Sequence, residues 1–182
     1  MGSRRNTILG LATIAAFVAT GLLANASAQE APVAAAGSPE IDYSGFAAMT
    51  DDVMAYRESR LVSLADFNAM KADPNTIILD TRSREAFDMG HIDGAVHLNF
   101  SDFTDEKLAK VIPSRGTRIL IYCNNNFADN VDPIPLKRAP LALNIPTFIN
   151  LVGYGYENVY ELGELVTIEE AGVNWVSSLH AP

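Results

Sequence analysis

The stretch Arg118-Ile119-Leu120-Ile121-Tyr122-Cys123 decides the fold that we expect for this chain. Its run of large apolar residues predicts a strand buried on both faces, as in a parallel sheet that helices cover on either side. Thr76-Ile77-Ile78-Leu79 is a second run of the same kind. Two shorter strands are expected at 95–98 and 159–162.

Helical segments alternate with these strands. We expect them over 45–58, where apolar residues recur every three or four positions, and from about Asn144 or Pro146 onward. Three others begin after capping residues, Ser63, Ser83 and Thr104. The sequence therefore predicts an α/β fold with a mostly parallel central sheet flanked by helices on both faces. The helix after Ser83 is expected to end at Gly90 in a left-handed conformation.

Composition limits the classes of function. The 182 residues suit one domain with appendages, and the formal net charge of −9 argues against nucleic-acid binding, because the chain would repel phosphates. The single cysteine allows neither an intramolecular disulfide nor a cysteine-based zinc site. His91, His97 and His180 do not have metal-ligand spacing, so we expect no metal and no cofactor.

The N-terminus has the pattern of a secretory signal peptide over residues 1–28. Arg4 and Arg5 precede an uncharged stretch, and Ala26-Ser27-Ala28 provides a cleavage site after Ala28. We therefore expect a periplasmic or secreted protein, with the choice between general and twin-arginine export left open. The alternative is an uncleaved segment that would be the chain's only membrane contact. Residues 29–40 are expected to be a flexible spacer and 41–60 an N-terminal helical extension.

Cys123 directly follows the strongest strand. Ligands of open α/β sheets bind at the carboxyl ends of the strands, and this cysteine lies at such an end. Backbone N–H groups of the next loop and helix N-terminus would favour its thiolate and lower its pKa. The alternative is a buried, structural cysteine.

Several motifs around Cys123 resemble those of the rhodanese domain. Gly90-His91-Ile92-Asp93-Gly94-Ala95 is the most specific of them. The other matching segments are 80–82, Asp-Thr-Arg; 85–87, Glu-Ala-Phe; 98–99, Leu-Asn; 121–123, Ile-Tyr-Cys; and 155–160, Gly-Tyr-Glu-Asn-Val-Tyr. The resemblance spans about residues 61–176, and we place a rhodanese-like domain at 61–178.

The resemblance implies a sulfurtransferase. Cys123 would be the nucleophile, carrying a sulfane sulfur as a persulfide from a small sulfur donor to a thiol or another thiophilic acceptor. Asp80, Arg82 and His91 would have supporting, structural roles.

The chain departs from the family pattern after Cys123. Ala128 stands where the family has a loop arginine, and residues 124–143 contain a proline-rich insertion. Asn124, Asn125 and Asn126, with Arg138, are candidates for a replacement anion cradle. The alternative is that the insertion covers the cysteine and abolishes turnover. Glu164, where the family has glycine, would disfavour anionic donors such as thiosulfate if it faces the site.

Three other functions compete with sulfur transfer. One is a catalytically inactive binding module, whose insertion would present Ile134, Pro135 and Leu136 as exposed anchors for a protein partner. Another is a redox-sensing thiol. A phosphatase is disfavoured, because such enzymes need an arginine where this chain has Asp129.

Overall fold

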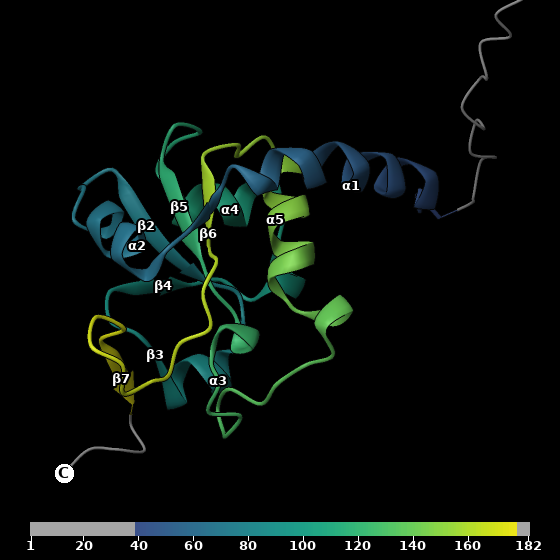
Figure 1. Ribbon diagram of the computed structural model, residues 1–182. Coiled ribbons are helices and arrows are strands. Elements are labelled where there is room, and N and C mark those ends of the chain that lie inside the picture. The colour runs from purple at the N-terminus through teal and green to yellow at the C-terminus, as the bar shows by residue number, and fades with distance from the viewer. Residues whose placement is uncertain (1–38, 178–182) are drawn as a thin grey trace, which may run out of the picture. The chain divides into compact units, whose positions relative to one another are not determined.

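The computed structural model describes residues 39–177 (Figure 1). The chain divides into two units, Met1–Ile41 and Asp42–Pro182, and the helices and strands of the described residues belong to the second. The expected signal peptide and most of the expected spacer lie outside the described residues. No helix within 39–177 is both long and apolar enough to cross a bilayer.

The centre of the second unit is a five-stranded sheet in which all neighbouring strands are parallel. Its order is β1-β6-β5-β2-β4, so the strand before Cys123 is the middle one. The strands are β1 (Leu61–Val62), β2 (Thr76–Asp80), β4 (Ala95–His97), β5 (Arg118–Ile121) and β6 (Val159–Leu162). The predicted parallel sheet is confirmed; the two-residue β1 is too short to give a periodic pattern in sequence.

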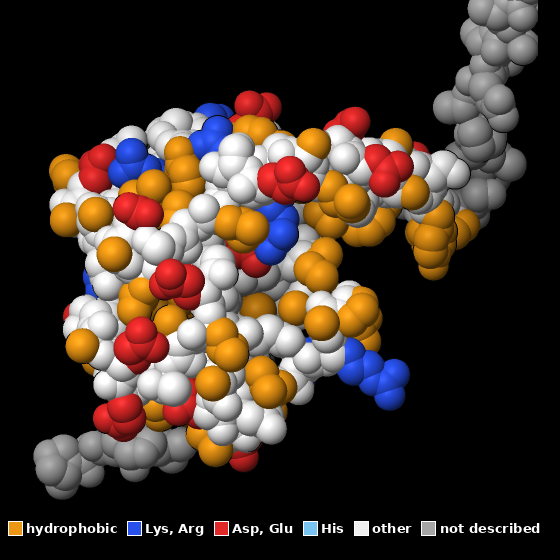
Figure 2. Space-filling model, viewed as in Figure 1, with side chains coloured by type: hydrophobic (Ala, Val, Ile, Leu, Met, Phe, Trp, Pro, Cys, Tyr) orange, Lys and Arg blue, Asp and Glu red, His pale blue; other side chains and the backbone are white. Residues whose placement is uncertain are grey.

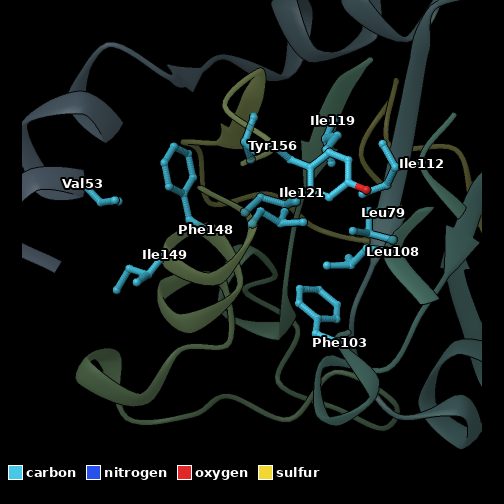
Figure 3. Packing of buried hydrophobic residues seen from close by; sticks show 12 residues of the cluster. Val53, Leu79, Phe103, Leu108, Ile112, Ile119, Ile121, Phe148, Ile149 and Tyr156 are labelled. Carbon is cyan, nitrogen blue, oxygen red and sulfur yellow. The ribbon is translucent and has the colours of Figure 1, made fainter. Parts of the chain in front are cut away.

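Helices cover both faces of this sheet (Figure 1). One face packs against α1 (Tyr43–Glu58), α4 (Asp105–Val111) and α5 (Asn144–Gly153), and the other packs against α2 (Leu64–Lys71). Successive side chains of β5 point to opposite faces of the sheet, so β5 contributes to the core on both sides. Ile119 and Ile121 join the core cluster beneath the first group of helices (Figure 3), while Leu120 joins the cluster on the opposite face.

The predicted helix starts are confirmed at three caps. The side chains of Ser63, Ser83 and Thr104 each accept a hydrogen bond from the backbone N–H three residues later. Helix α5 begins at Asn144, within the predicted range.

The expectation for Gly90 is wrong. Helix α3 (Arg84–Met89) ends there, but Gly90 has an extended backbone with φ of 172° and begins β3 (Gly90–Ile92). This strand pairs antiparallel with β7 (Trp175–Ser177). A Cβ atom on Gly90 would lie 2.7 Å from the indole nitrogen of Trp175. Glycine is therefore required by the close approach of the indole and not by a left-handed conformation.

The insertion after β5 is an ordered flap, residues 127–143. It is preceded by the 3₁₀ helix η2 (Asn124–Asn126) and contains η3 (Ala139–Leu141). Ile134, which the binding-module alternative places on the surface, is fully buried in the core cluster on the α2 face, so that part of the alternative is wrong. Burial of a large apolar side chain stabilises its ordered state, which explains why this residue fixes the flap to the domain. Leu136 is 45% exposed.

We predict that Ile134→Ala lowers the free energy of unfolding by about 2–4 kcal/mol, because it leaves a cavity under the flap. The matched control, Leu136→Ala, should change it by less than about 0.5 kcal/mol. Urea denaturation followed by circular dichroism measures both. Equal effects of the two substitutions would contradict the anchoring role of Ile134.

Candidate active site

Cys123 lies at the bottom of a pocket at the carboxyl end of β5. The residue is only 2% exposed, yet it lines a cavity of about 360 Å³. The walls are formed by the end of α1, by the flap around η3, and by the segment after β6. Figure 2 shows the surface hollowed beneath α1, between that helix and the flap. The insertion therefore forms one wall of the pocket that Cys123 lines.

Three backbone N–H groups act on the Cys123 sulfur. They belong to Asn125 in η2 and to Leu143 and Asn144 at the start of α5. Leu143 is the N-cap of this helix and provides no side-chain cap, so the first N–H groups remain available to other partners. The sulfur thus faces the positive end of a ten-residue helix, as the sequence led us to expect.

The pKa of the Cys123 thiol is raised, whereas we expected it to be lowered. Burial raises the pKa of the thiol, because the thiolate loses its hydration. The N–H groups of Asn144, Asn125 and Leu143 lower it, and the negative charge of Glu161 raises it again. The result is a raised pKa. The three N–H donors are present, but their effect on the thiol pKa is smaller than that of burial.

Asn126 fixes the shape of the cysteine loop. Its Oδ1 accepts from the backbone N–H of Cys123 at 3.0 Å and from Nδ2 of Asn144 at 3.2 Å. Its Nδ2 donates to the carbonyl oxygens of Leu162 at 2.8 Å and Glu164 at 3.2 Å. One buried amide therefore connects the loop after β5, the start of α5 and the end of β6.

The side chains of Asn124 and Asn125 bind the flap. Asn124 Nδ2 donates to the carbonyl of Pro135 at 3.0 Å. Asn125 Nδ2 donates to the carbonyl of Lys137 at 2.8 Å, and its Oδ1 accepts from the N–H of the same residue at 3.2 Å. Arg138 is exposed and lines neither this pocket nor the neighbouring one described below. The donors aimed at the sulfur are therefore backbone groups, including that of Asn125, and not asparagine or arginine side chains.

Asp80 and Arg82 form a buried ion pair at the end of β2. Asp80 is fully buried and Arg82 is 4% exposed, and Nε of Arg82 lies 3.0 Å from Oδ1 of Asp80. The hydroxyl of Tyr122 donates to Asp80 at 2.5 Å and accepts from the N–H of Ile92 at 3.1 Å. Burial and the charge of Asp80 raise the pKa of Tyr122 well above its ordinary value. This network braces three strand ends.

His91 contacts its own turn. Its Nδ1 lies 2.8 Å from the carbonyl oxygen of Phe87, and the two rings stack with centroids 3.8 Å apart. It lines neither pocket.

A second cavity, of about 530 Å³, lies on the other side of the cysteine loop. Its walls come from α3, from the flap and from Asn124 and Asn125, which separate it from the Cys123 pocket. Arg82 contributes to this cavity. Residues 39–177 contain no group of three or more histidine, cysteine, aspartate or glutamate side chains placed to hold a metal ion.

Two residues of the Cys123 pocket were not predicted from sequence. Arg57 comes from the end of α1 and Glu161 from β6, and they form an ion pair with a shortest N–O distance of 2.5 Å. A glutamate inside an otherwise apolar strand, Val159-Tyr160-Glu161-Leu162, is an unusual residue to bury and could have marked this site. No sequence pattern links it to Arg57, because 104 positions separate the two.

Comparison with known proteins agrees with the fold. The model of the rhodanese-like domain matches residues 63–163, so the chain belongs to the rhodanese-like domain family.

Two curated relatives are tRNA uridine(34) hydroxylases. That of Cytophaga hutchinsonii is 27% identical over 108 residues, covering 58% of this chain and 30% of the relative. That of Nitrobacter hamburgensis is 34% identical over 65 residues, covering 34% and 26%. The chain thus spans less than a third of the length of these relatives.

Two solved structures are similar at 19% identity. Thiosulfate sulfurtransferase from Pseudomonas aeruginosa aligns with a TM-score of 0.44, over 68% of this chain and 21% of that one. The BH2092 protein from Bacillus halodurans aligns with a TM-score of 0.43, over 62% and 73%.

We predict that Asp80→Asn lowers the free energy of unfolding by about 3–5 kcal/mol, because it leaves the buried Arg82 charge without its partner. Asp102→Asn removes the exposed pair with Lys107 and should cost less than about 1 kcal/mol. Thermal and urea denaturation of both variants measure the difference. An Asp80→Asn protein as stable as the parent would contradict the bracing role.

We predict that the Cys123 thiol titrates above the same thiol in the urea-unfolded chain. The measurement is the rate of alkylation by iodoacetamide as a function of pH. Glu161→Gln should move the folded midpoint down, because it removes the negative charge that disfavours the thiolate. A folded midpoint below that of the unfolded chain would show that the N–H groups outweigh burial.

Proposed function

We propose that the protein is a sulfurtransferase in which Cys123 carries a sulfane sulfur as a persulfide. The observation that carries this proposal is the set of three N–H groups, from Asn125, Leu143 and Asn144, that act on a cysteine lining a pocket. Membership of the rhodanese-like family supports it. A terminal persulfide sulfur would extend from Cys123 into a region where N–H dipoles stabilise its negative charge.

The first half-reaction moves one sulfur atom and is balanced in electrons. The Cys123 sulfur, after losing its proton, attacks the outer sulfur of a donor persulfide, R–S–S–H. The sulfur–sulfur bond of the donor breaks, its electron pair stays on R–S⁻, and that thiolate takes up the proton released by Cys123. In the second half-reaction a thiol acceptor attacks the outer sulfur on Cys123, and the cysteine leaves in its original state.

The raised pKa of Cys123 slows the uptake of sulfur from the donor. At neutral pH the resting cysteine is mainly a protonated thiol, so its deprotonation is part of the barrier to sulfur uptake. Sulfur uptake is therefore expected to accelerate as pH rises toward the raised pKa. The same protonation protects the resting enzyme against alkylating and oxidising compounds.

We also propose that the protein works outside the cytoplasm, on the basis of the expected signal peptide at residues 1–28. We do not extend the relatives' activity on tRNA to this chain, because the shared region is a minor part of their length and because the acidic chain would repel RNA. The expected partners are a small sulfur donor and a thiol acceptor.

Intact-protein mass spectrometry tests the sulfur-carrier role. After incubation with inorganic polysulfide or a small-molecule persulfide and removal of the excess, the protein should gain the mass of one sulfur atom. A thiol added next should remove it and appear as a new persulfide. Cys123→Ser, which keeps a polar side chain of similar size, should gain nothing. If the parent protein stays unmodified at every donor concentration, Cys123 is a structural thiol and the domain is a binding module.

A further inference from the structure

The charges in the Cys123 pocket differ from those expected of a site for oxyanions. Among the described residues that line it, Arg57 is the only basic one, and Glu161 and Glu164 are the two acidic ones. Counted as formal charges, the lining is net negative while Cys123 is a thiol. Ala128 stands where the family has its loop arginine, and neither Lys137 nor Arg138 of the flap lines this pocket.

Arg57 is engaged by Glu161 through two hydrogen bonds. Nε donates to Oε2 at 2.5 Å and Nη2 donates to Oε1 at 2.8 Å, which is the bidentate geometry of a guanidinium with a carboxylate. Nδ2 of Asn144 donates to Oε1 of Glu161 at 3.2 Å, and Glu161 is only 6% exposed. The Nε/Nη2 edge of the guanidinium, one of the two that can bind a sulfonate or carboxylate, is therefore occupied by a group of this chain.

Apart from the remaining N–H groups of Arg57, the hydrogen-bonding capacity that the pocket's side chains leave open consists of acceptors. Glu164 uses one carboxylate oxygen to accept from the N–H of Leu64 at 2.7 Å, which leaves a charged group at the rim. Oδ1 of Asn144, whose residue is 3% exposed, is buried with no hydrogen-bond partner among the described residues. Such a lining suits a ligand that carries hydrogen-bond donors or a positive charge, and it penalises an additional anion.

We propose that the Arg57–Glu161 pair determines donor specificity, excluding anionic sulfur donors and admitting persulfides whose organic group is uncharged or positively charged. The proposal rests on the sulfurtransferase function proposed above. Helix α1 is then part of the active site, although Arg57 precedes the family-matched region that begins at residue 63. An ammonium group on the donor would face Glu164, while its outer sulfur reaches Cys123.

A matched series of donors tests this proposal. The persulfides of cysteamine, 2-mercaptoethanol and 3-mercaptopropionate differ mainly in the charge of the organic group, which is positive, neutral and negative, and thiosulfate adds an inorganic dianion. We expect kcat/KM of the parent protein to fall in that order, with the anionic donors at least about tenfold below the neutral one.

Substitutions at the ion pair should change this dependence on donor charge. Glu161→Gln removes one negative charge and frees the Arg57 guanidinium, and it should raise kcat/KM for 3-mercaptopropionate persulfide and thiosulfate by about tenfold relative to the neutral donor. Combining it with Arg57→Met should abolish the gain. Arg57→Met alone should lower the rate with anionic donors further. The control, Glu106→Gln, breaks an exposed pair with Lys110 on α4 and should change nothing.

The outcomes separate the two proposals. If no donor transfers sulfur to the parent protein, the proposed function itself fails. If sulfur transfer proceeds but does not depend on donor charge, or if Glu161→Gln leaves the relative rates unchanged, sulfur transfer stands and the specificity role of the Arg57–Glu161 pair is wrong.

Discussion

The structure depends on how the N-terminus of α5 is held against the carboxyl end of β5. Two buried amides make this junction. Asn126 accepts from the N–H of Cys123, and Asn144 donates both to Asn126 and to Glu161 on the neighbouring strand. The flap is inserted between Asn126 and α5, and the start of α5 still lies beside Cys123. The N–H groups of Leu143 and Asn144 therefore reach the sulfur despite the insertion.

Two opposing electrostatic effects determine the pKa of the Cys123 thiol. Burial and Glu161 disfavour a thiolate, while the N–H groups favour it, and burial dominates. A persulfide would place its charge on a second sulfur, farther from the buried Cβ and closer to the solvent-facing part of the pocket. The same surroundings can thus keep the resting cysteine unreactive and still stabilise the sulfur-loaded form. In our proposal, the acidic lining of the pocket also disfavours donors whose organic group is negatively charged.

Sequence patterns predicted the parts of the fold that depend on local periodicity. The apolar run at β5, the caps at Ser63 and Thr104 and the start of α5 were found because each has a signature within a few residues. The position of Cys123 at a strand end followed from the same patterns. Strands β1, β3 and β7 were missed, because two or three residues that pair with distant segments have no periodicity to detect.

The errors and omissions around the site have a common physical cause, which is tertiary packing. The binding-module alternative places Ile134 on the surface as an anchor for a partner, yet the flap folds back and buries it. Gly90 was expected in a left-handed conformation at the end of a helix, whereas the indole of Trp175 is what excludes a side chain there. Arg57 and Glu161 meet only because β1 and β6 are neighbours in the sheet. Contacts of this kind depend on the complete fold.

The most direct test of the central claim is a crystal structure of the protein after incubation with polysulfide. The account predicts an extra sulfur atom on Cys123, within hydrogen-bond distance of the N–H groups of Asn125, Leu143 and Asn144. A structure from crystals grown at saturating polysulfide that shows an unmodified Cys123, or a sulfur atom directed away from these groups, would contradict it.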